Sequence, residues 1–391
     1  MSTDALPLLT LQPFADSAQR WAGVLLHGEP GAPAAALTAA IQRLCGEFGL
    51  HPALAGLPCA LPPGLLAEPA LAAVLPPGQT LLRLPAALWH DPQRSDEFAT
   101  WRAQAYRLLA DGPPPAEGAY PASITGRVID HAAGDDLSRS PTLRGPHLAL
   151  GVNDEAALAR CRDAGIDWVA GDYPLTQPVK PAVASPGRAV MLKLLAQVSA
   201  DADTALIEAT LKQDQQLSYQ LLKMVNSVAF SLDNKIGSFK QAIALLGRRQ
   251  LQRWVQLLLY GRKSANDLAN PLMPRAALRA GLLESLAAAA GEDKPAQDQA
   301  FMVGMFSLLE PLLGQPMTTI IQPLNLPGPV AQALLARGGA HGTRLAAVEA
   351  CENGAGAAAR RALDDAGISV EAWTRVQSHA WQWAIKISRE A

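Results

Sequence analysis

Lysine is absent from the first 179 residues of this 391-residue sequence, and the first one is Lys180. Histidine is absent from another long stretch, because none of the seven histidines lies between residues 148 and 340. The first gap excludes chemistry that depends on a lysine ammonium group in the N-terminal part of the chain. The second excludes imidazole metal ligands from most of the C-terminal part.

Cysteine is scarce as well, with four residues at positions 45, 59, 161 and 351 and no close pair. This spacing excludes a zinc ribbon, a CxxC redox motif and a disulfide framework, and it favours buried thiols in a reducing compartment. No apolar run reaches the ~18 residues that cross a bilayer. The opening MSTDALPLL also lacks the basic segment of a signal peptide. We therefore expect a cytoplasmic protein with no membrane contact.

The length and composition indicate a folded protein of two domains. Apolar residues make up 49% of the chain and charged residues 17%, which is typical of globular proteins. A proline-marked stretch at 174–186 predicts a linker, so we expect domains at 1–180 and 187–391. The net charge of -2, without a basic stripe that contains aromatic residues, does not favour nucleic acid as a partner.

The N-terminal part alternates short apolar runs with helical patterns, which predicts βαβ units around a parallel sheet. The helical patterns cover residues 34–48 and 98–110. At about 175 residues this part is short for a full eight-unit barrel, so we expect a trimmed or irregular one. The predicted strands are Leu8–Pro13, Gly23–His27, Thr80–Leu84, His147–Val152 and Ile166–Ala170.

The C-terminal part is helical nearly to its end, which makes the overall fold class α/β plus all-α. Residues 217–229 carry an apolar stripe of helical spacing, and Gly247 predicts a break between two helices. Tryptophans at 381 and 383 point to different faces of one helix, so at least one is expected at an interface. Further helical patterns cover residues 272–290, 296–313, 328–336, 341–351, 355–366 and 369–387.

The segment 214–261 resembles the centre of an HDOD domain, an all-helical module related to the metal-dependent HD phosphohydrolases. The matching pieces are Asn226-Ser227 after an apolar helix, then Ile236 and Ser238, then the sequence AIALLG at 242–247. The resemblance continues through AFMVGMFSLLEPLLGQPM at 300–317 and covers about 200 residues. It implies an HDOD fold for residues 187–391.

HD enzymes activate water with metal ions held by imidazole and carboxylate ligands. Where the similar HD enzymes carry a His-Asp pair, this sequence offers Ser307, Leu308 and Leu309. His341 and His379 stand alone, and we interpret each as a surface or core histidine. We therefore expect no metal, no cofactor and no catalytic residue in this half.

The segment 149–178 resembles the closing stretch of EAL domains, the barrel phosphodiesterases that cleave cyclic di-GMP. In that family it reads approximately A-E-G-V-E, a helix, then G-x-D-x-x-Q-G-Y. Here Leu150 and Asn153 replace the two glutamates, and Ala170 replaces the glutamine. Near the start, 11–28 resembles the strand pair with the Glu-Ala-Leu signature, and Val24 is the nearest match to its glutamate. These replacements, together with the missing lysine, imply a degenerate EAL domain.

Two other groups leave alternatives open. Asp130 and the pair Asp135-Asp136 suit either a remnant metal site or a solvated loop, and we favour the loop. Arg248, Arg249 and Arg253 form a loose basic patch for a phosphate or an acidic partner, or else a solvated helix start. Together with Asn226 and Ser227, these arginines are the candidate partner-binding residues.

The resemblance to bacterial EAL–HDOD proteins implies a non-catalytic signalling scaffold that binds another bacterial signalling protein. On this interpretation both ancestral catalytic sites are lost and the chain is not an enzyme. The alternatives are a cyclic di-GMP receptor, whose ligand binding we do not favour, and a residual cyclic di-GMP phosphodiesterase.

Overall fold

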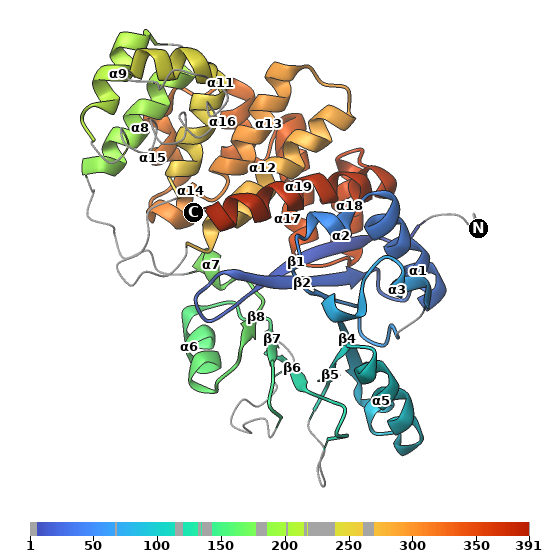
Figure 1. Ribbon diagram of the computed structural model, residues 1–391. Coiled ribbons are helices and arrows are strands. Elements are labelled where there is room, and N and C mark those ends of the chain that lie inside the picture. Colours follow the sequence, from blue (N-terminus) through green and yellow to red (C-terminus); the bar gives the residue numbers. More distant parts are fainter. Residues whose placement is uncertain are drawn as a thin grey trace, which may run out of the picture.

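The computed structural model describes residues 6–66, 69–113, 120–131, 134, 143–176, 186–200, 202–214, 217, 239–260 and 270–390. Figure 1 shows the two parts, with strands and short helices below and a stack of helices above. Within the described residues, none of the helices combines the length and apolarity needed to cross a membrane.

The first part is a closed barrel in which the strands follow one another in chain order from β1 to β8. β1 pairs antiparallel with both β2 and β8, and every other neighbouring pair is parallel. The strands are β1 (Leu9–Ala15), β2 (Trp21–Gly28), β3 (Cys59–Ala60), β4 (Thr80–Pro85), β5 (Arg107–Asp111), β6 (Gly126–Asp130), β7 (Leu148–Leu150) and β8 (Trp168–Val169).

The barrel is closed although the segment is short, because its elements are shortened and none of the eight strands is missing. β3 and β8 have two residues each. The α-helices described around the strands are also short: α1 (Ala34–Gln42), α2 (Leu50–Ala53), α3 (Pro69–Ala72), α4 (Ala86–Trp89), α5 (Ser95–Ala103), α6 (Glu155–Asp163) and α7 (Tyr173–Thr176). A π-helical turn at Arg43–Glu47 and 3₁₀ turns at Pro77–Gln79 and Pro92–Arg94 complete them.

One predicted helix is partly wrong. The pattern at 98–110 gives helix α5 up to Ala103, but residues from Arg107 onwards form strand β5. Leu108, Leu109 and Ala110 are all buried. A fully buried parallel strand reads as a continuous apolar run, and periodicity alone does not separate it from a buried helix.

The second part is helical, as predicted. Gly247 breaks α11 with φ 74° and ψ 157°, and this confirms the expected interruption. The helices are α8 (Pro186–Ser199), α9 (Thr204–Leu211), α11 (Phe239–Leu258), α12 (Leu272–Ala289), α13 (Lys294–Phe306), α14 (Leu309–Leu313), α15 (Met317–Ile321), α16 (Gly328–Ala336), α17 (Gly339–Glu352), α18 (Ala357–Asp365) and α19 (Val370–Glu390), with a 3₁₀ turn at Gln322–Leu324.

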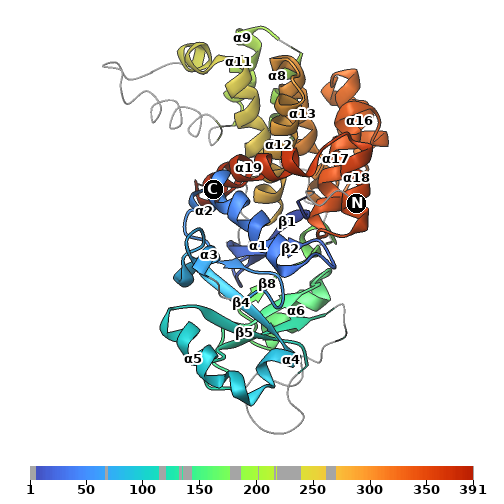
Figure 2. The same ribbon diagram turned by 90° about the vertical axis from the view of Figure 1, so that its right-hand side faces the viewer.

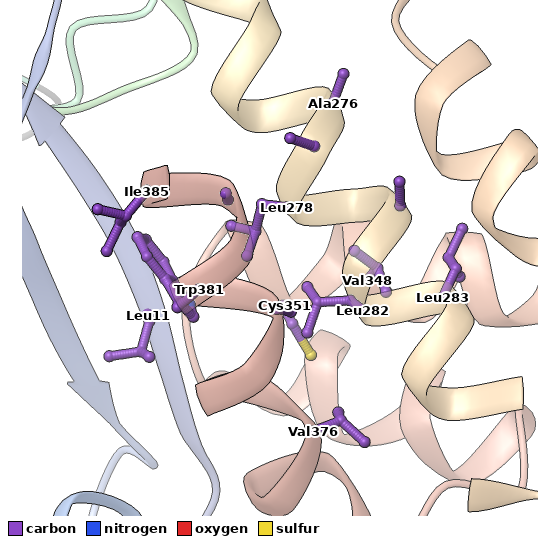
Figure 3. Close-up of a cluster of buried hydrophobic side chains, with 14 of the residues drawn as sticks. Leu11, Ala276, Leu278, Leu282, Leu283, Val348, Cys351, Val376, Trp381 and Ile385 are labelled. Carbon is purple, nitrogen blue, oxygen red and sulfur yellow. The ribbon is translucent and has the colours of Figure 1, made fainter. Parts of the chain in front are cut away.

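The two parts share one hydrophobic core. The last helix, α19, crosses the outer face of the β1–β2 pair (Figures 1 and 2). Its Trp381 lies beside Leu11 of β1 and Ile385 (Figure 3), and all three belong to the same buried cluster. Trp373 Nε1 donates a hydrogen bond to the carbonyl of Leu9 at 3.0 Å. The C-terminal helix therefore covers a barrel face that the helices following the strands leave open.

The two neighbouring tryptophans of α19 serve different parts of the molecule. Trp381 packs on Trp21 of β2 with the ring centroids 5.0 Å apart, across the boundary between the parts. Trp383 instead packs edge-on against Phe301 of α13 at 5.3 Å. The predicted interface role of one member of the pair is confirmed.

Candidate functional site at the barrel mouth

The barrel interior is an apolar layer that takes one residue from each strand or its immediate end. This cluster consists of Phe14, Leu25, Ala60, Leu81, Leu109, Val128, Leu148 and Ala170. Because side chains alternate along a strand, residues two positions further on face the same interior. Residues beyond this layer at the carboxyl ends of the parallel strands form the barrel mouth, where barrel enzymes place their sites.

Arg83 and Asp111 lie at this mouth, at the ends of β4 and β5. Arg83 Nε donates to Asp111 Oδ2 at 3.0 Å, and Nη2 lies 2.8 Å from the same oxygen. The Arg83 side chain is 7% exposed and that of Asp111 is 19% exposed. The pair therefore places a largely buried cation beside an anion that still reaches solvent.

His27 lies close to this pair, at the end of β2. Its Nε2 is 3.1 Å from Gln12 Oε1 of β1. Burial, and after it the positive charge of Arg83, together lower the pKa of His27 to about 4. The imidazole is thus neutral at physiological pH, and with Nε2 engaged by Gln12 it leaves Nδ1 as its remaining polar atom.

The depressed pKa of His27 predicts an acid-dependent loss of stability. Between about pH 6.5 and pH 4 the unfolded chain binds a proton at this histidine and the folded chain does not. Stability is therefore fully present above the unfolded pKa and falls as the pH is lowered through this window. We expect His27→Gln to flatten the pH dependence of the melting temperature there. Equal slopes for both proteins would contradict this expectation, since the other titrating groups cancel in the comparison.

The four positions matched to the EAL signatures fall in different places. Leu150 packs against the interior layer, and Ala170 belongs to it. Asn153 lies in the loop after β7, where its Oδ1 accepts a hydrogen bond from the amide of Asp172 at 3.0 Å. Val24 belongs to the core outside the barrel, whereas Leu25 belongs to the interior.

The inward-facing residues of β2 are therefore Gly23, Leu25 and His27. A Cβ atom at position 23 would overlap the ring of Phe14, which fills the space in front of that glycine. Matching by motif alone aligned Val24 with the glutamate of the EAL signature. Val24 faces outward, and its neighbour Leu25 faces the barrel interior. A shift of one residue moves a side chain to the opposite face of a strand.

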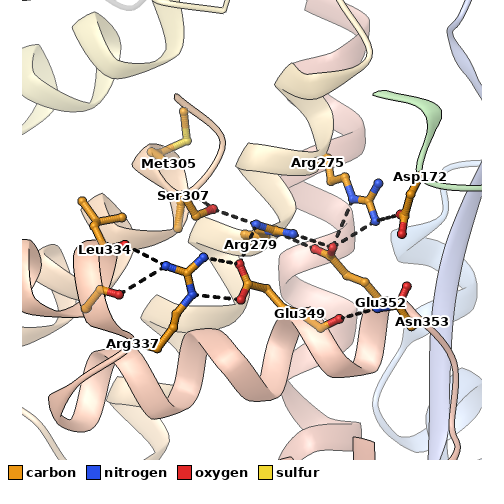
Figure 4. Close-up of polar contacts among 12 residues, drawn as sticks. Asp172, Arg275, Arg279, Met305, Ser307, Leu334, Arg337, Glu349, Glu352 and Asn353 are labelled. Atoms are coloured by element: carbon orange, nitrogen blue, oxygen red, sulfur yellow. Dashed lines mark hydrogen bonds and ion pairs between the residues drawn. The ribbon is translucent and has the colours of Figure 1, made fainter. Parts of the chain in front are cut away.

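In the helical part, the position expected for the HD ligands is next to a buried arginine of another helix. Ser307, which follows α13, accepts a hydrogen bond from Arg279 Nη1 of α12 at 3.1 Å (Figure 4). Arg279 also forms two 2.7 Å hydrogen bonds with Glu352 of α17. It reaches Glu349 Oε1 at 3.2 Å. The Arg279 side chain is 5% exposed, so its charge is balanced inside the helical part.

The predicted basic patch is already occupied within the chain. Arg249 and Arg253 both contact Glu284 of α12 and Asp298 of α13, at distances from 2.6 to 3.3 Å. Arg248 donates to the carbonyl of Ala202 at 2.6 Å. These arginines tie α11 to its neighbours. The other candidates, Asn226 and Ser227, and the acidic pair Asp135-Asp136 lie outside the described residues.

The carboxylates described at the mouth do not fit a divalent metal centre of the kind that EAL enzymes use. Asp111 is engaged by Arg83 and Asp172 by Arg275, while Leu150 and Ala170 offer no ligand atoms. The loop predicted for Asp130 is wrong, because Asp130 is the last residue of strand β6, two positions beyond Val128 of the interior layer. Across the described ranges, no three His, Cys, Asp or Glu side chains gather as a metal site requires.

Comparison with known families identifies the helical part. The model of the HDOD domain matches residues 186–313. The chain contains an HDOD domain. The predicted architecture, an EAL-type barrel followed by an HDOD domain, is confirmed by the closed eight-stranded barrel and by this match.

Two curated bacterial proteins are similar in sequence. The cyclic di-GMP phosphodiesterase CdgJ of Vibrio cholerae is 29% identical over 248 residues, which cover 62% of this chain and 56% of CdgJ. The uncharacterized protein YuxH of Bacillus subtilis is 36% identical over 127 residues, or 32% of this chain and 31% of YuxH. The matched region is thus about half of CdgJ and about a third of YuxH.

The match to CdgJ contradicts the prediction that this chain is not an enzyme. CdgJ, which matches 62% of this chain, is named a phosphodiesterase. That prediction rested on matching signature positions along the sequence. The placement of Val24 outside the barrel shows one physical reason why such matching is unsafe.

Two solved structures are similar over less than half of this chain. The phosphodiesterase PaMucR in complex with cyclic di-GMP is 15% identical, with a TM-score of 0.32 over 42% of this chain and 89% of that one. A standalone EAL protein of Vibrio cholerae bound to cyclic di-GMP is 12% identical, with a TM-score of 0.33 over 44% and 91%.

Sequence reasoning missed the polar residues of the mouth. His27 and Arg83 lie at or near the ends of strands that were predicted, so their position at a strand's carboxyl end was an available signal. Asp111 was not accessible in this way, because its strand was interpreted as the end of a helix.

Proposed function

We propose that this chain works in cyclic di-GMP signalling and binds the dinucleotide at the barrel mouth. The observation that carries this proposal is the Arg83 guanidinium, held beside Asp111 and His27 at the carboxyl ends of the strands. A guanidinium suits the anionic phosphates of such a ligand. The sequence similarity to CdgJ supports the choice of dinucleotide.

The test is calorimetric titration of the full chain with cyclic di-GMP. We expect Arg83→Gln to weaken binding by ~10-fold or more, as the loss of a charge-assisted contact does. Arg107→Gln is the matched control, because Arg107 is exposed at the amino end of β5, away from the mouth. Absence of binding to the unaltered chain, or equal losses in both variants, would refute the proposal.

Hydrolysis of the dinucleotide is a second candidate function, favoured by the printed activity of CdgJ. Chromatography of cyclic di-GMP incubated with the protein and Mg²⁺ or Mn²⁺ tests it directly. Linear product formed in proportion to protein supports a phosphodiesterase. Binding without product supports a receptor, whose HDOD domain would then act on a bacterial partner protein.

A further inference from the structure

A chain of alternating charges runs from the end of β8 into the helical domain (Figure 4). It starts at Asp172 in the barrel and passes through two arginines of α12 and two glutamates of α17. It ends at Arg337, the residue that caps α16. In order, its members are Asp172, Arg275, Glu352, Arg279, Glu349 and Arg337.

The first link joins the barrel to α12. Arg275 Nη2 lies 2.6 Å from Asp172 Oδ1 and 3.0 Å from Glu352 Oε2, so this guanidinium bridges two carboxylates. The Arg275 side chain is 9% exposed. A buried cation depends strongly on its anions, and loss of Asp172 would leave Glu352 as the carboxylate that holds it.

Asp172 is placed by the loops of the barrel mouth. Its amide donates to Asn153 Oδ1 in the loop after β7. Gly171 beside it packs so closely on Val152 that a Cβ atom there would overlap the Val152 backbone. Movement of the loops after β7 and β8 therefore also moves the Asp172 carboxylate.

The far end of the charge chain fixes the end of α16, which packs on α17, the helix that contacts β1. Arg337 lies 3.0 and 2.9 Å from the two oxygens of Glu349. It also donates to the carbonyl of Leu334 at 2.8 Å, at the end of α16. Arg279, in the middle of the charge chain, donates a hydrogen bond to Ser307, which follows α13. One connected set of ion pairs thus links the mouth to α12, α13, α16 and α17.

We propose that Asp172 couples the state of the barrel mouth to the packing of α16 and α17 in the helical part. This inference rests on the proposed function insofar as the mouth is the place where the ligand binds. Asp172 is a positioning residue, because it acts through Arg275 and Glu352. Contiguous contacts alone do not prove coupling, so the effect must be measured at the distant end.

The protein offers a matched control at the same barrel mouth. Glu29 follows β2 and pairs with Arg360 of α18 at 3.0 Å, which is also a contact between barrel and helices. Its side chain is 29% exposed, against 31% for Asp172. Glu29 contacts none of the six members of the charge chain in any ion pair described.

The experiment measures amide hydrogen exchange of the full chain without ligand, peptide by peptide. We expect Asp172→Asn to speed exchange across 333–352 by ~5-fold or more, the lower end of typical coupling between sites. Glu29→Gln should leave those peptides unchanged. Arg275→Lys, which keeps the charge but not the two-sided bridge, should reproduce the effect. Unchanged exchange across 333–352 in folded Asp172→Asn, or the same change in Glu29→Gln, would overturn the proposal.

A second arm adds saturating cyclic di-GMP. In the unaltered chain the ligand should change exchange across 333–352, and in Asp172→Asn this response should be lost while calorimetry still shows binding. A ligand response that persists in Asp172→Asn would count against the coupling. If the unaltered chain binds no dinucleotide, the proposed function fails and the ligand-free arm still decides the coupling.

Discussion

Replacing Glu352 with glutamine is expected to destabilise the protein by about 3–5 kcal/mol, the usual cost of leaving buried charge uncompensated. Glu352 is 12% exposed and accepts from two arginines. Glutamine has nearly the same shape, but its amide group faces Arg279 and Arg275 with one acceptor and no charge. Chemical denaturation at neutral pH measures the loss.

The control for this experiment is Glu371→Gln. Glu371 is 52% exposed and pairs with Arg375 at 3.1 Å on the surface of α19. Exposed ion pairs contribute little because water and salt screen them, so no measurable change is expected. Equal losses in the two variants would show that the network in Figure 4 is not what stabilises the helical domain.

The pH dependence gives Glu352 a second signature. Burial would raise the pKa of this carboxyl, but the charges and hydrogen bonds of Arg279 and Arg275 outweigh burial and lower it. A depressed folded-state pKa gives stability that is present above the unfolded value and lost as pH falls through the folded one. Acid denaturation of the unaltered chain should therefore be steeper than that of Glu352→Gln.

Replacing Trp381 with alanine is expected to cost about 3–5 kcal/mol, as large-to-small changes of buried aromatic residues do. Trp381 is 1% exposed and fills the space between α19 and the β1–β2 pair. Its loss removes the contact with Trp21 and leaves a cavity at the boundary of the two parts. Thermal denaturation measures the cost, and amide exchange in β1 and β2 should rise with it.

Trp383→Ala is the matched control, since it removes the same side chain from the same helix. Trp383 is half-buried and packs on Phe301 within the helical part. Trp383→Ala should therefore lower the free energy of unfolding by less than Trp381→Ala does, and it should leave amide exchange in β1 and β2 unaltered. If Trp381→Ala melted like the unaltered chain, α19 would not be the element that joins the barrel to the helices.

The sequence predicted the elements whose local pattern is strong. The Gly247 break and the helices α12, α13, α16, α17, α18 and α19 follow from helical spacing, capping and glycine, which act within a few residues. The break that separates α14 from α13 within the pattern at 296–313, and the short α15, were not predicted. The strand β4 was predicted with nearly its observed bounds. The HDOD domain was identified from an ordered series of motifs and is confirmed by the family model.

Short elements were missed because their signals are weak. β3 has two residues, and β5 is an apolar run that a helix would also explain. Closure of eight strands depends on pairing between segments far apart in sequence. No local pattern reports that pairing. The length of the segment therefore predicted a trimmed barrel, as the two-residue strands confirm, but it did not predict that all eight strands close.

Local periodicity by itself determined that this chain is an α/β part followed by a helical part, and the resemblance of the motifs at 214–261 and 300–317 identified the HDOD domain. Only the tertiary structure decided which face of each strand looks inward, and it placed His27 at the mouth and Val24 outside. It also paired Arg249 with Glu284 and Arg275 with Asp172. The members of these pairs are 35 and 103 residues apart in sequence. Ion pairs form between side chains that are close in space, and no local sequence pattern reports which distant residues the fold brings together.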